Sequence, residues 1–184
     1  VLSEEEGFKA LVHELGKKIK GIIVAKKNSK INKLEDLSKQ TIAFPAPASF
    51  AATLIPKANL AHKNISFQSK YVNSHDAVYR NIAMGRFVAG GGIIRTFNAL
   101  PEFYRKQLKI IWTSDGYTPH AIATHPRVNE ETRQKLLSGF LDIENSDSSV
   151  QLLTPLRMKG FTQANDQEWN DVRSLDIHLL LGKN

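Results

Sequence analysis

The sequence predicts an α/β fold with a mainly parallel sheet, and three observations support this prediction. Short apolar runs of strand length alternate along the chain with amphipathic segments of helical spacing. Some of these runs turn directly into a helix through small or polar residues, as in "FPAPASFAATLIP" at residues 44–56. The chain has 184 residues, which is enough for one ordinary domain or two small lobes with cores of their own.

The first half of the chain predicts three strands and three helices. In order, we expect a helix over 4–16, a strand in "KGIIVAKKN" (20–28), a short helix in "INKLEDLSK" (31–39), a strand in "TIAFPAP" (41–47), a helix over 49–61 and a strand in "SFQSKYV" (66–72). Pro56 interrupts the helix over 49–61, where it removes one backbone hydrogen bond and bends the helix.

The second half continues the alternation. Ser74 caps a helix that ends at Gly85, and Asn129 caps the helix over 129–143. Between them we expect a strand over 86–94, a helix over 95–100 that stops before Pro101, a strand over 108–114, a turn over 115–119 and a strand over 120–125. The rest of the chain is predicted to be mixed, mainly helical.

Three predicted strand-to-helix turns contain polar residues. They lie at Ser49, at Ser74–His75 and at Ile94–Thr96. Ligands of open α/β sheets bind at the carboxyl ends of the strands, where such turns gather on one edge. A helix N-terminus there also offers unpaired N–H groups to an anion. We therefore expect the binding site at this edge.

The charge of the chain is basic, with a net value of +7. Much of the excess lies in the lysines of residues 16–33. A patch for nucleic acid or acidic lipid is one interpretation. The lysines are not interleaved with aromatic residues, so we favour a solvated basic face that helps to steer small anions, and we expect no nucleic-acid partner.

Several kinds of chemistry are not expected. The chain contains no cysteine, which excludes disulfides, thiolate zinc sites and thiol catalysis. His120 and His125 fall on opposite faces of a predicted strand, which argues against a metal site. Ser74, His75 and Asp76 are neighbours at a helix start and point apart, so they do not form a catalytic triad. We expect no catalytic residue, no metal and no cofactor.

The run "AGGGII" (89–94) and the two residues after it allow more than one interpretation. The run lacks the ending of a phosphate-binding loop, and its glycines indicate either tight packing or close approach of a ligand. Arg95 and Thr96 follow directly, and an arginine there suits a carboxylate or a phosphoryl oxygen. A surface ion pair with a residue such as Glu102 is the alternative, and both stay open.

Several segments together resemble the periplasmic binding proteins of ABC transporters for phosphonate, phosphite and phosphate. They are "GIIVAKKNSKINKLEDLSKQTIAF" (21–44), "ASFAATLIPKANL" (48–60), "SHDA" (74–77), "GGIIRTF" (91–97), "TSDGYTPHAIATHPRV" (113–128) and "KGFTQANDQEWNDVRSL" (159–175). The resemblance covers most of the chain from Gly21 to Leu175.

The resemblance implies a type II periplasmic-binding-protein fold, in which two α/β lobes joined by crossing strands close on a ligand. Residues 1–28 would hold a remnant of lobe 1 and a crossing strand, 29–117 a complete lobe 2, and 118–184 the return strand and the C-terminal part of lobe 1. Proteins of this kind have a further βα segment before the point where this chain begins, so we expect the first lobe to be incomplete and a signal sequence to be absent from this chain.

The resemblance also implies a site in the interlobe cleft. Ser49 matches the first residue of a Ser-Thr-Ser run that holds phosphoryl oxygens, and Phe50 and Ala51 replace the other two hydroxyls while keeping their N–H groups. His75 matches a histidine that contacts the same oxygens. Relatives that bind aminophosphonates have a carboxylate near the position of Arg95, so the cation here implies a purely anionic ligand.

The expected ligand-binding residues also include Thr96, Tyr117 and His120. Tyr117 and His120, on the returning strand, would sense closure of the lobes. The implied function is a non-enzymatic, monomeric and periplasmic or lipid-anchored protein that captures a phosphate-, phosphite- or phosphonate-type anion for an ABC permease. The alternative is the ligand-sensing domain of a membrane sensor kinase or of a transcription regulator with the same fold.

Overall fold

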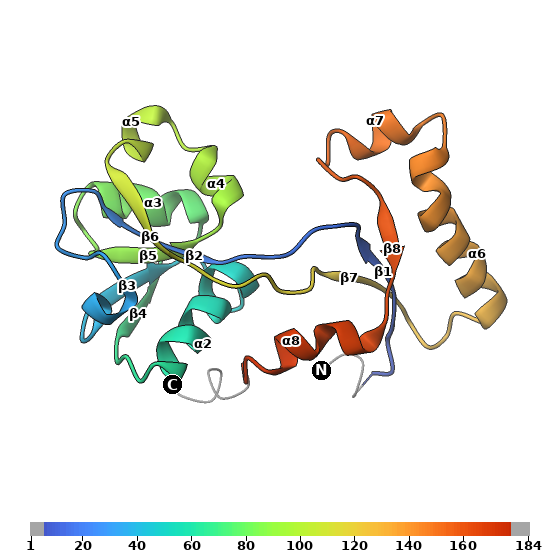
Figure 1. Ribbon diagram of the computed structural model, residues 1–184, viewed down its shortest axis with the longest axis horizontal. Coiled ribbons are helices and arrows are strands. Elements are labelled where there is room, and N and C mark those ends of the chain that lie inside the picture. Colours follow the sequence, from blue (N-terminus) through green and yellow to red (C-terminus); the bar gives the residue numbers. More distant parts are fainter. Residues whose placement is uncertain (1–5, 178–184) are drawn as a thin grey trace. The chain divides into compact units, whose positions relative to one another are not determined.

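The computed structural model of the protein describes residues 6–177 (Figure 1). Positions 4 and 5 of the helix predicted over 4–16 therefore lie outside the described residues. The chain forms two compact units. Unit 1 contains Val1–Lys18 and Tyr117–Val172, and unit 2 contains Ile19–Gly116 and Arg173–Asn184. Because the units alternate in sequence, the chain crosses from one to the other three times.

Unit 2 is built on a five-stranded sheet with the order β4-β3-β5-β2-β6. Its strands are β2 (Ile22–Lys26), β3 (Thr41–Phe44), β4 (Gln68–Tyr71), β5 (Ala89–Gly92) and β6 (Leu108–Thr113). Strand β3 pairs in parallel with β4 and β5, whereas β2 pairs antiparallel with β5 and β6. The α/β class is confirmed, but the sheet is mixed rather than mainly parallel.

The mixed pairing has a simple cause in the connectivity. Helical segments between β3 and β4 and between β4 and β5 return the chain to the edge of the sheet where β3 begins. Strands β4 and β5 therefore run parallel to β3. Strand β2 follows the first crossing from unit 1, and β6 precedes the return crossing. The residues next to these crossings pair with each other, since Gly21 and Ser114 exchange hydrogen bonds of 2.9 and 3.0 Å.

Helices cover both faces of this sheet. They are η1 (Leu34–Leu37), the π-helical turn η2 (Phe50–Leu54), α2 (Ile55–His62), α3 (His75–Ala83), α4 (Ile94–Asn98) and α5 (Glu102–Arg105). Side chains alternate between the faces of a strand, so Ile22 packs with Ile82 of α3 while its neighbour Ile23 packs with Leu60 of α2.

The predicted caps of α3 are present in the structure, whereas the predicted break at Pro56 is not. Ser74 Oγ accepts a hydrogen bond of 3.0 Å from Ala77 N, and Gly85 has φ +77° after the end of α3, which confirms the predicted start and end of this helix. Pro56 does not interrupt a helix. It lies in the first turn of α2, where a missing N–H costs little, and the preceding turn is π-helical.

Unit 1 has a three-stranded antiparallel sheet of order β7-β1-β8, formed by β1 (Lys9–Glu14), β7 (Ala121–Thr124) and β8 (Phe161–Gln163). Its helices are α6 (Glu130–Asp142), η3 (Ile143–Asn145), α7 (Ser149–Leu153), η4 (Asp166–Trp169) and α8 (Asn170–Arg173). Leu137 of α6 packs on Leu11 and Val12 of β1.

One sequence prediction in unit 1 is wrong. The segment from Lys9 to Glu14 is a strand rather than part of a helix, because it pairs with β7 on one side and β8 on the other. A central strand buries consecutive residues, here Leu11, Val12 and His13, and such a run also fits the spacing of an amphipathic helix. Strand β8 lies, with η3, α7, η4 and α8, in the part of the chain that the sequence predicts to be mixed and mainly helical. Within residues 6–177, every helix is too short or too polar to cross a membrane.

Candidate anion site at the sheet edge of unit 2

The carboxyl ends of three neighbouring strands in unit 2 lie at one edge of the sheet. Strands β4, β3 and β5 are adjacent and parallel, and each is followed by a helical segment, as Figure 1 shows. Ser49 follows β3, His75 follows β4 and Arg95 follows β5. The structure therefore brings the three predicted turns to the same edge of the sheet.

The turn after β3 is held by the backbone and by a buried hydroxyl. The carbonyl oxygen of Ser49 accepts hydrogen bonds from Thr53 N at 2.9 Å and Leu54 N at 3.1 Å. The Thr53 hydroxyl, fully buried, donates to the carbonyl oxygen of Ala46 at 2.8 Å and closes the proline-containing loop. The Ser49 side chain makes no capping hydrogen bond, so its hydroxyl is not used to hold the helix start.

The glycines of "AGGGII" are explained by tight packing rather than by a phosphate loop. A Cβ at Gly91 would overlap the carbonyl oxygen of Ala52, and a Cβ at Gly21 would overlap that of Ala51. A Cβ at Gly92 would overlap the hydroxyl of Tyr79. Only glycine allows the π-helical turn and α3 to lie this close to β2 and β5.

His75 is the first residue of α3, and its ring is half-buried. Burial lowers the pKa of the imidazole below its usual value of 6.5. Its Nδ1 atom is buried and has no hydrogen-bond partner among the residues that the structure describes. The ring is therefore neutral at pH 7 and can donate one hydrogen bond.

Arg95 lies on α4 and is exposed to solvent. The alternative, an ion pair between Arg95 and Glu102, is not found in the structure of residues 6–177, where Glu102 pairs with Lys106 at 2.9 Å. An exposed guanidinium at the carboxyl ends of the strands can present its planar fork to a phosphoryl or carboxylate group.

Tyr79 connects α3 to the turn that carries Arg95, and sequence reasoning did not single it out. Its hydroxyl accepts a hydrogen bond from Ile93 N at 3.0 Å, and it lies 3.1 Å from Ile93 O and 3.0 Å from Thr96 Oγ1. Thr96 Oγ1 also donates to Ile93 O at 3.1 Å. The hydroxyl of Thr96 is thus engaged in fixing this turn, and burial raises the pKa of Tyr79 so that it stays protonated. A buried tyrosine needs such a partner, which is the signal that could have pointed to it.

Tyr117 and His120 belong to unit 1, on the segment between β6 and β7. Thr118, between them, is buried and donates from its backbone N to Asp171 Oδ2 at 2.7 Å and from its hydroxyl to Glu168 O at 2.8 Å. This segment is therefore anchored within unit 1. The role of Tyr117 and His120 in ligand binding stays a prediction, as does the ligand role of each residue at the edge of unit 2.

Comparison with solved structures identifies the fold. The fold is similar to that of XAC2383 from Xanthomonas citri bound to ATP, with a TM-score of 0.85 at 14% identity over 98% of this chain and 74% of that one. PhnD1 from Prochlorococcus marinus in complex with methylphosphonate gives 0.77 at 20% identity over 94% and 71%. The aliphatic sulphonate binding protein SsuA from Escherichia coli gives 0.71 at 11% over 97% and 65%. The fold is that of the type II periplasmic binding proteins.

A match of the sequence to a known family identifies the family of this chain. Residues 1–169 match the family described as "ABC transporter, phosphonate, periplasmic substrate-binding protein". The chain belongs to this family, which confirms the resemblance seen in the sequence. It is a substrate-binding protein and not an enzyme, its family acts outside the cytoplasm, and it works with a small-molecule ligand and a membrane permease.

Proposed function

We propose that this protein binds a small, purely anionic oxyanion of the phosphate, phosphite or phosphonate type at the sheet edge of unit 2 and delivers it to an ABC permease. The observation that carries the proposal is the convergence of Ser49, His75 and Arg95 at the carboxyl ends of three adjacent parallel strands. Family membership and the methylphosphonate bound by the structural relative PhnD1 support the class of ligand.

Each residue has a distinct role in this proposal. The Ser49 hydroxyl and the backbone N–H groups of Phe50 and Ala51 bind anion oxygens at the start of the π-helical turn. Arg95 supplies a bidentate, charge-assisted contact. His75 donates one hydrogen bond from its neutral ring and gains a proton more readily when an anion is next to it. Phe50 and Ala51 stand where the relatives have hydroxyl residues. The charged contacts therefore contribute a larger share of the binding free energy here than in a site with all three hydroxyls.

Isothermal titration calorimetry of the protein with phosphate, phosphite, methylphosphonate and sulfate tests the proposal. We expect one anion of the phosphorus series to bind more tightly than sulfate. ATP serves as a further competitor, because the structure of XAC2383 was solved with it bound. If none of the phosphorus oxyanions binds to the folded protein, the proposal is wrong.

Replacing Arg95 with alanine tests the site itself. Losing a charge-assisted hydrogen-bonded contact of about 1.5–3 kcal/mol corresponds to a Kd that is roughly 10- to 150-fold weaker. The matched control is Arg86→Ala, since Arg86 is an exposed arginine of the same unit that follows the C-terminal end of α3. Unchanged anion affinity in Arg95→Ala would remove Arg95 from the site.

The proposal includes a monomer as the binding form, and sedimentation of the protein with and without anion measures this directly.

The proposal also keeps Tyr117 and His120 as ligand contacts. Tyr117→Phe and His120→Gln, titrated with the same anion, separate a contact from a residue that serves only the fold of unit 1.

A further inference from the structure

The positive charge of the protein is divided unequally between the two units. Residues 19–116 of unit 2 contain fifteen lysines and arginines against five aspartates and glutamates, a formal net charge of +10. Residues 1–18 and 117–172 of unit 1 contain eight basic and twelve acidic residues, a formal net charge of −4. The basic character of the chain is therefore a property of unit 2 alone.

Within unit 2 the cations gather at the edge where the parallel strands begin. Strand β2 runs antiparallel to β5, so its C-terminal residue Lys26 lies at this edge, paired with Leu108 at the start of β6. Helix α2 ends near the same edge, since Lys63, which follows its last residue, pairs with Glu35 of η1 at 3.4 Å. Helix α3 ends there as well, because the Nζ atom of Lys26 lies 3.8 Å from the position that a Cβ would take at Gly85, just after the end of α3.

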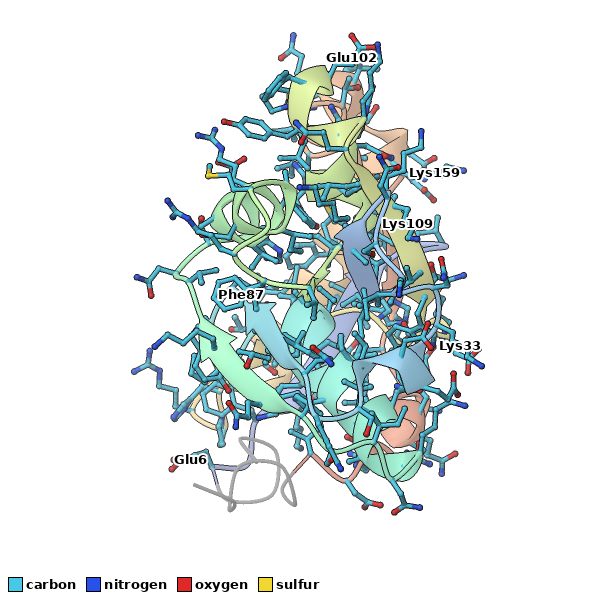
Figure 2. All side chains as sticks on the ribbon, turned by 90° about the vertical axis from the view of Figure 1, so that its left-hand side faces the viewer. Glu6, Lys33, Phe87, Glu102, Lys109 and Lys159 are labelled. Carbon is cyan, nitrogen blue, oxygen red and sulfur yellow. The ribbon has the colours of Figure 1, made fainter. Side chains whose placement is uncertain are left out.

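We call this surface the basic edge. It consists of Lys26, Lys27, Lys30, Lys33, Lys39, Lys63, Arg86 and Lys109. Lys109 donates to Asn32 Oδ1 at 2.7 Å, which places it beside Lys33, and Figure 2 shows these two labelled lysines on the same flank.

Few acidic groups neutralise the basic edge. Residues 26–40 contain five lysines and two acidic residues, Glu35 and Asp36. Glu35 pairs with Lys63, while Asp36 Oδ2 accepts hydrogen bonds from the backbone N atoms of Asn32 at 2.8 Å and Lys33 at 3.2 Å. A net positive charge therefore remains at this edge, on exposed side chains such as Lys27 and Lys30.

The basic edge lies at the wrong end of the sheet to hold the anion proposed above. The candidate anion site is at the carboxyl ends of β3, β4 and β5, and the basic edge is at their amino ends. Strands of four or five residues separate the two ends by roughly 15 Å. That distance is about twice the Debye length of about 8 Å at physiological salt, so solvent largely screens the lysines from an anion in the site.

The chemistry of the basic edge selects the kind of partner. Seven of its eight cations are lysines, which are strongly hydrated point charges on flexible stems. Specific protein interfaces are depleted in lysine and enriched in arginine and aromatic residues. A spread of exposed lysines instead suits a diffuse layer of negative charge, and an anionic bilayer surface has that property.

We propose that the basic edge of unit 2 binds the anionic headgroups of a phospholipid bilayer. The protein serves a permease that lies in such a bilayer, so electrostatic attachment would keep it near its membrane partner. The attachment is reversible, because it involves no apolar insertion. It is also independent of the anion site, since it uses different residues at the other edge of the sheet.

Vesicle co-sedimentation of the folded protein tests the proposal. We expect binding to vesicles that contain phosphatidylglycerol, little binding to vesicles of phosphatidylcholine alone, and release as the salt concentration rises. Binding that does not require the anionic lipid, or no binding to either kind of vesicle at low salt, overturns the proposal.

A pair of matched variants separates the basic edge from net charge. Lys27→Glu together with Lys30→Glu should weaken binding to the anionic vesicles by about tenfold or more. The control, Arg127→Glu together with Lys159→Glu, makes the same change of charge at exposed positions of unit 1 and should change binding less than about threefold. Equal losses in the two double variants would contradict the proposal. Both double variants should keep the anion affinity of the unmodified protein, so a failure here is distinct from a failure of the anion site.

Discussion

At the scale of single residues, the candidate site combines side chains whose environments differ. Arg95 is exposed and keeps its charge in water, whereas His75 is half-buried and its ring is held neutral. Ser49 has a hydroxyl that is not used in capping its helix. An entering anion would therefore meet one permanent charge and one group that changes its proton affinity, which makes binding sensitive to pH.

The pH dependence of stability should reveal the half-buried histidine, His75. Because burial lowers the pKa of His75 in the folded protein, the unfolded chain binds more protons as the pH falls below about 6.5. The free energy of unfolding should therefore decrease from about pH 6.5 downward and stop decreasing, for this residue, below its folded pKa. Urea unfolding of the unmodified protein and of His75→Gln across this pH range measures the difference. Parallel pH profiles for the two proteins would show that His75 is not buried as described.

At the scale of secondary structure, α3 and α4 are coupled through one hydroxyl. Tyr79 reaches past Gly92, and its hydrogen bonds with Ile93 and Thr96 fix the turn from which Arg95 projects. The same helix α3 begins with His75. One buried tyrosine thus links the helix that begins with His75 to the turn that carries Arg95.

Replacing Tyr79 with phenylalanine should lower both stability and anion affinity. The change leaves Ile93 N without its acceptor, which costs about 1–3 kcal/mol of the free energy of unfolding. It also frees the turn that carries Arg95, so the anion should bind several-fold more weakly. Tyr104→Phe is the control, because the ring of Tyr104 packs on Phe103 and Arg80 and keeps these contacts without its hydroxyl. Full anion affinity in Tyr79→Phe would show that the turn does not depend on this hydroxyl.

How much could be predicted from the sequence differs between the elements. Strands β2 to β7 and helix α3 were predicted because local patterns and caps agree with their final environment. Strand β1 was not, since its pairing with β7 and β8 lies more than a hundred residues away in sequence and overrides the local pattern. Tyr79 was missed for a related reason, because its role depends on Ile93 and Thr96 on another element. The residues of the candidate edge could be named in advance because each directly follows a recognisable strand.

At the scale of the whole molecule, two ways of interacting with anions must be kept apart. Unit 2 has a specific candidate site at one edge of its sheet and a diffuse positive charge at the other. Both would raise the stability of the folded state when an anion is added, because any ligand that binds only the folded protein stabilises it. The stabilisation through the diffuse charge should be the same for different anions at the same ionic strength, whereas the stabilisation through the specific site should depend on which anion is added.

Thermal unfolding with added anions distinguishes these contributions. At about 100 times its Kd, the ligand of the specific site should add about 2.7 kcal/mol to the free energy of unfolding, beyond the effect of chloride at the same ionic strength. Arg95→Ala should lose about half of this increment or more at the same anion concentration, because its Kd is weaker, whereas Lys27→Glu with Lys30→Glu should keep it. If the double variant loses the increment and Arg95→Ala keeps it, the anion binds at the basic edge and the site proposed at the carboxyl ends of the strands is wrong.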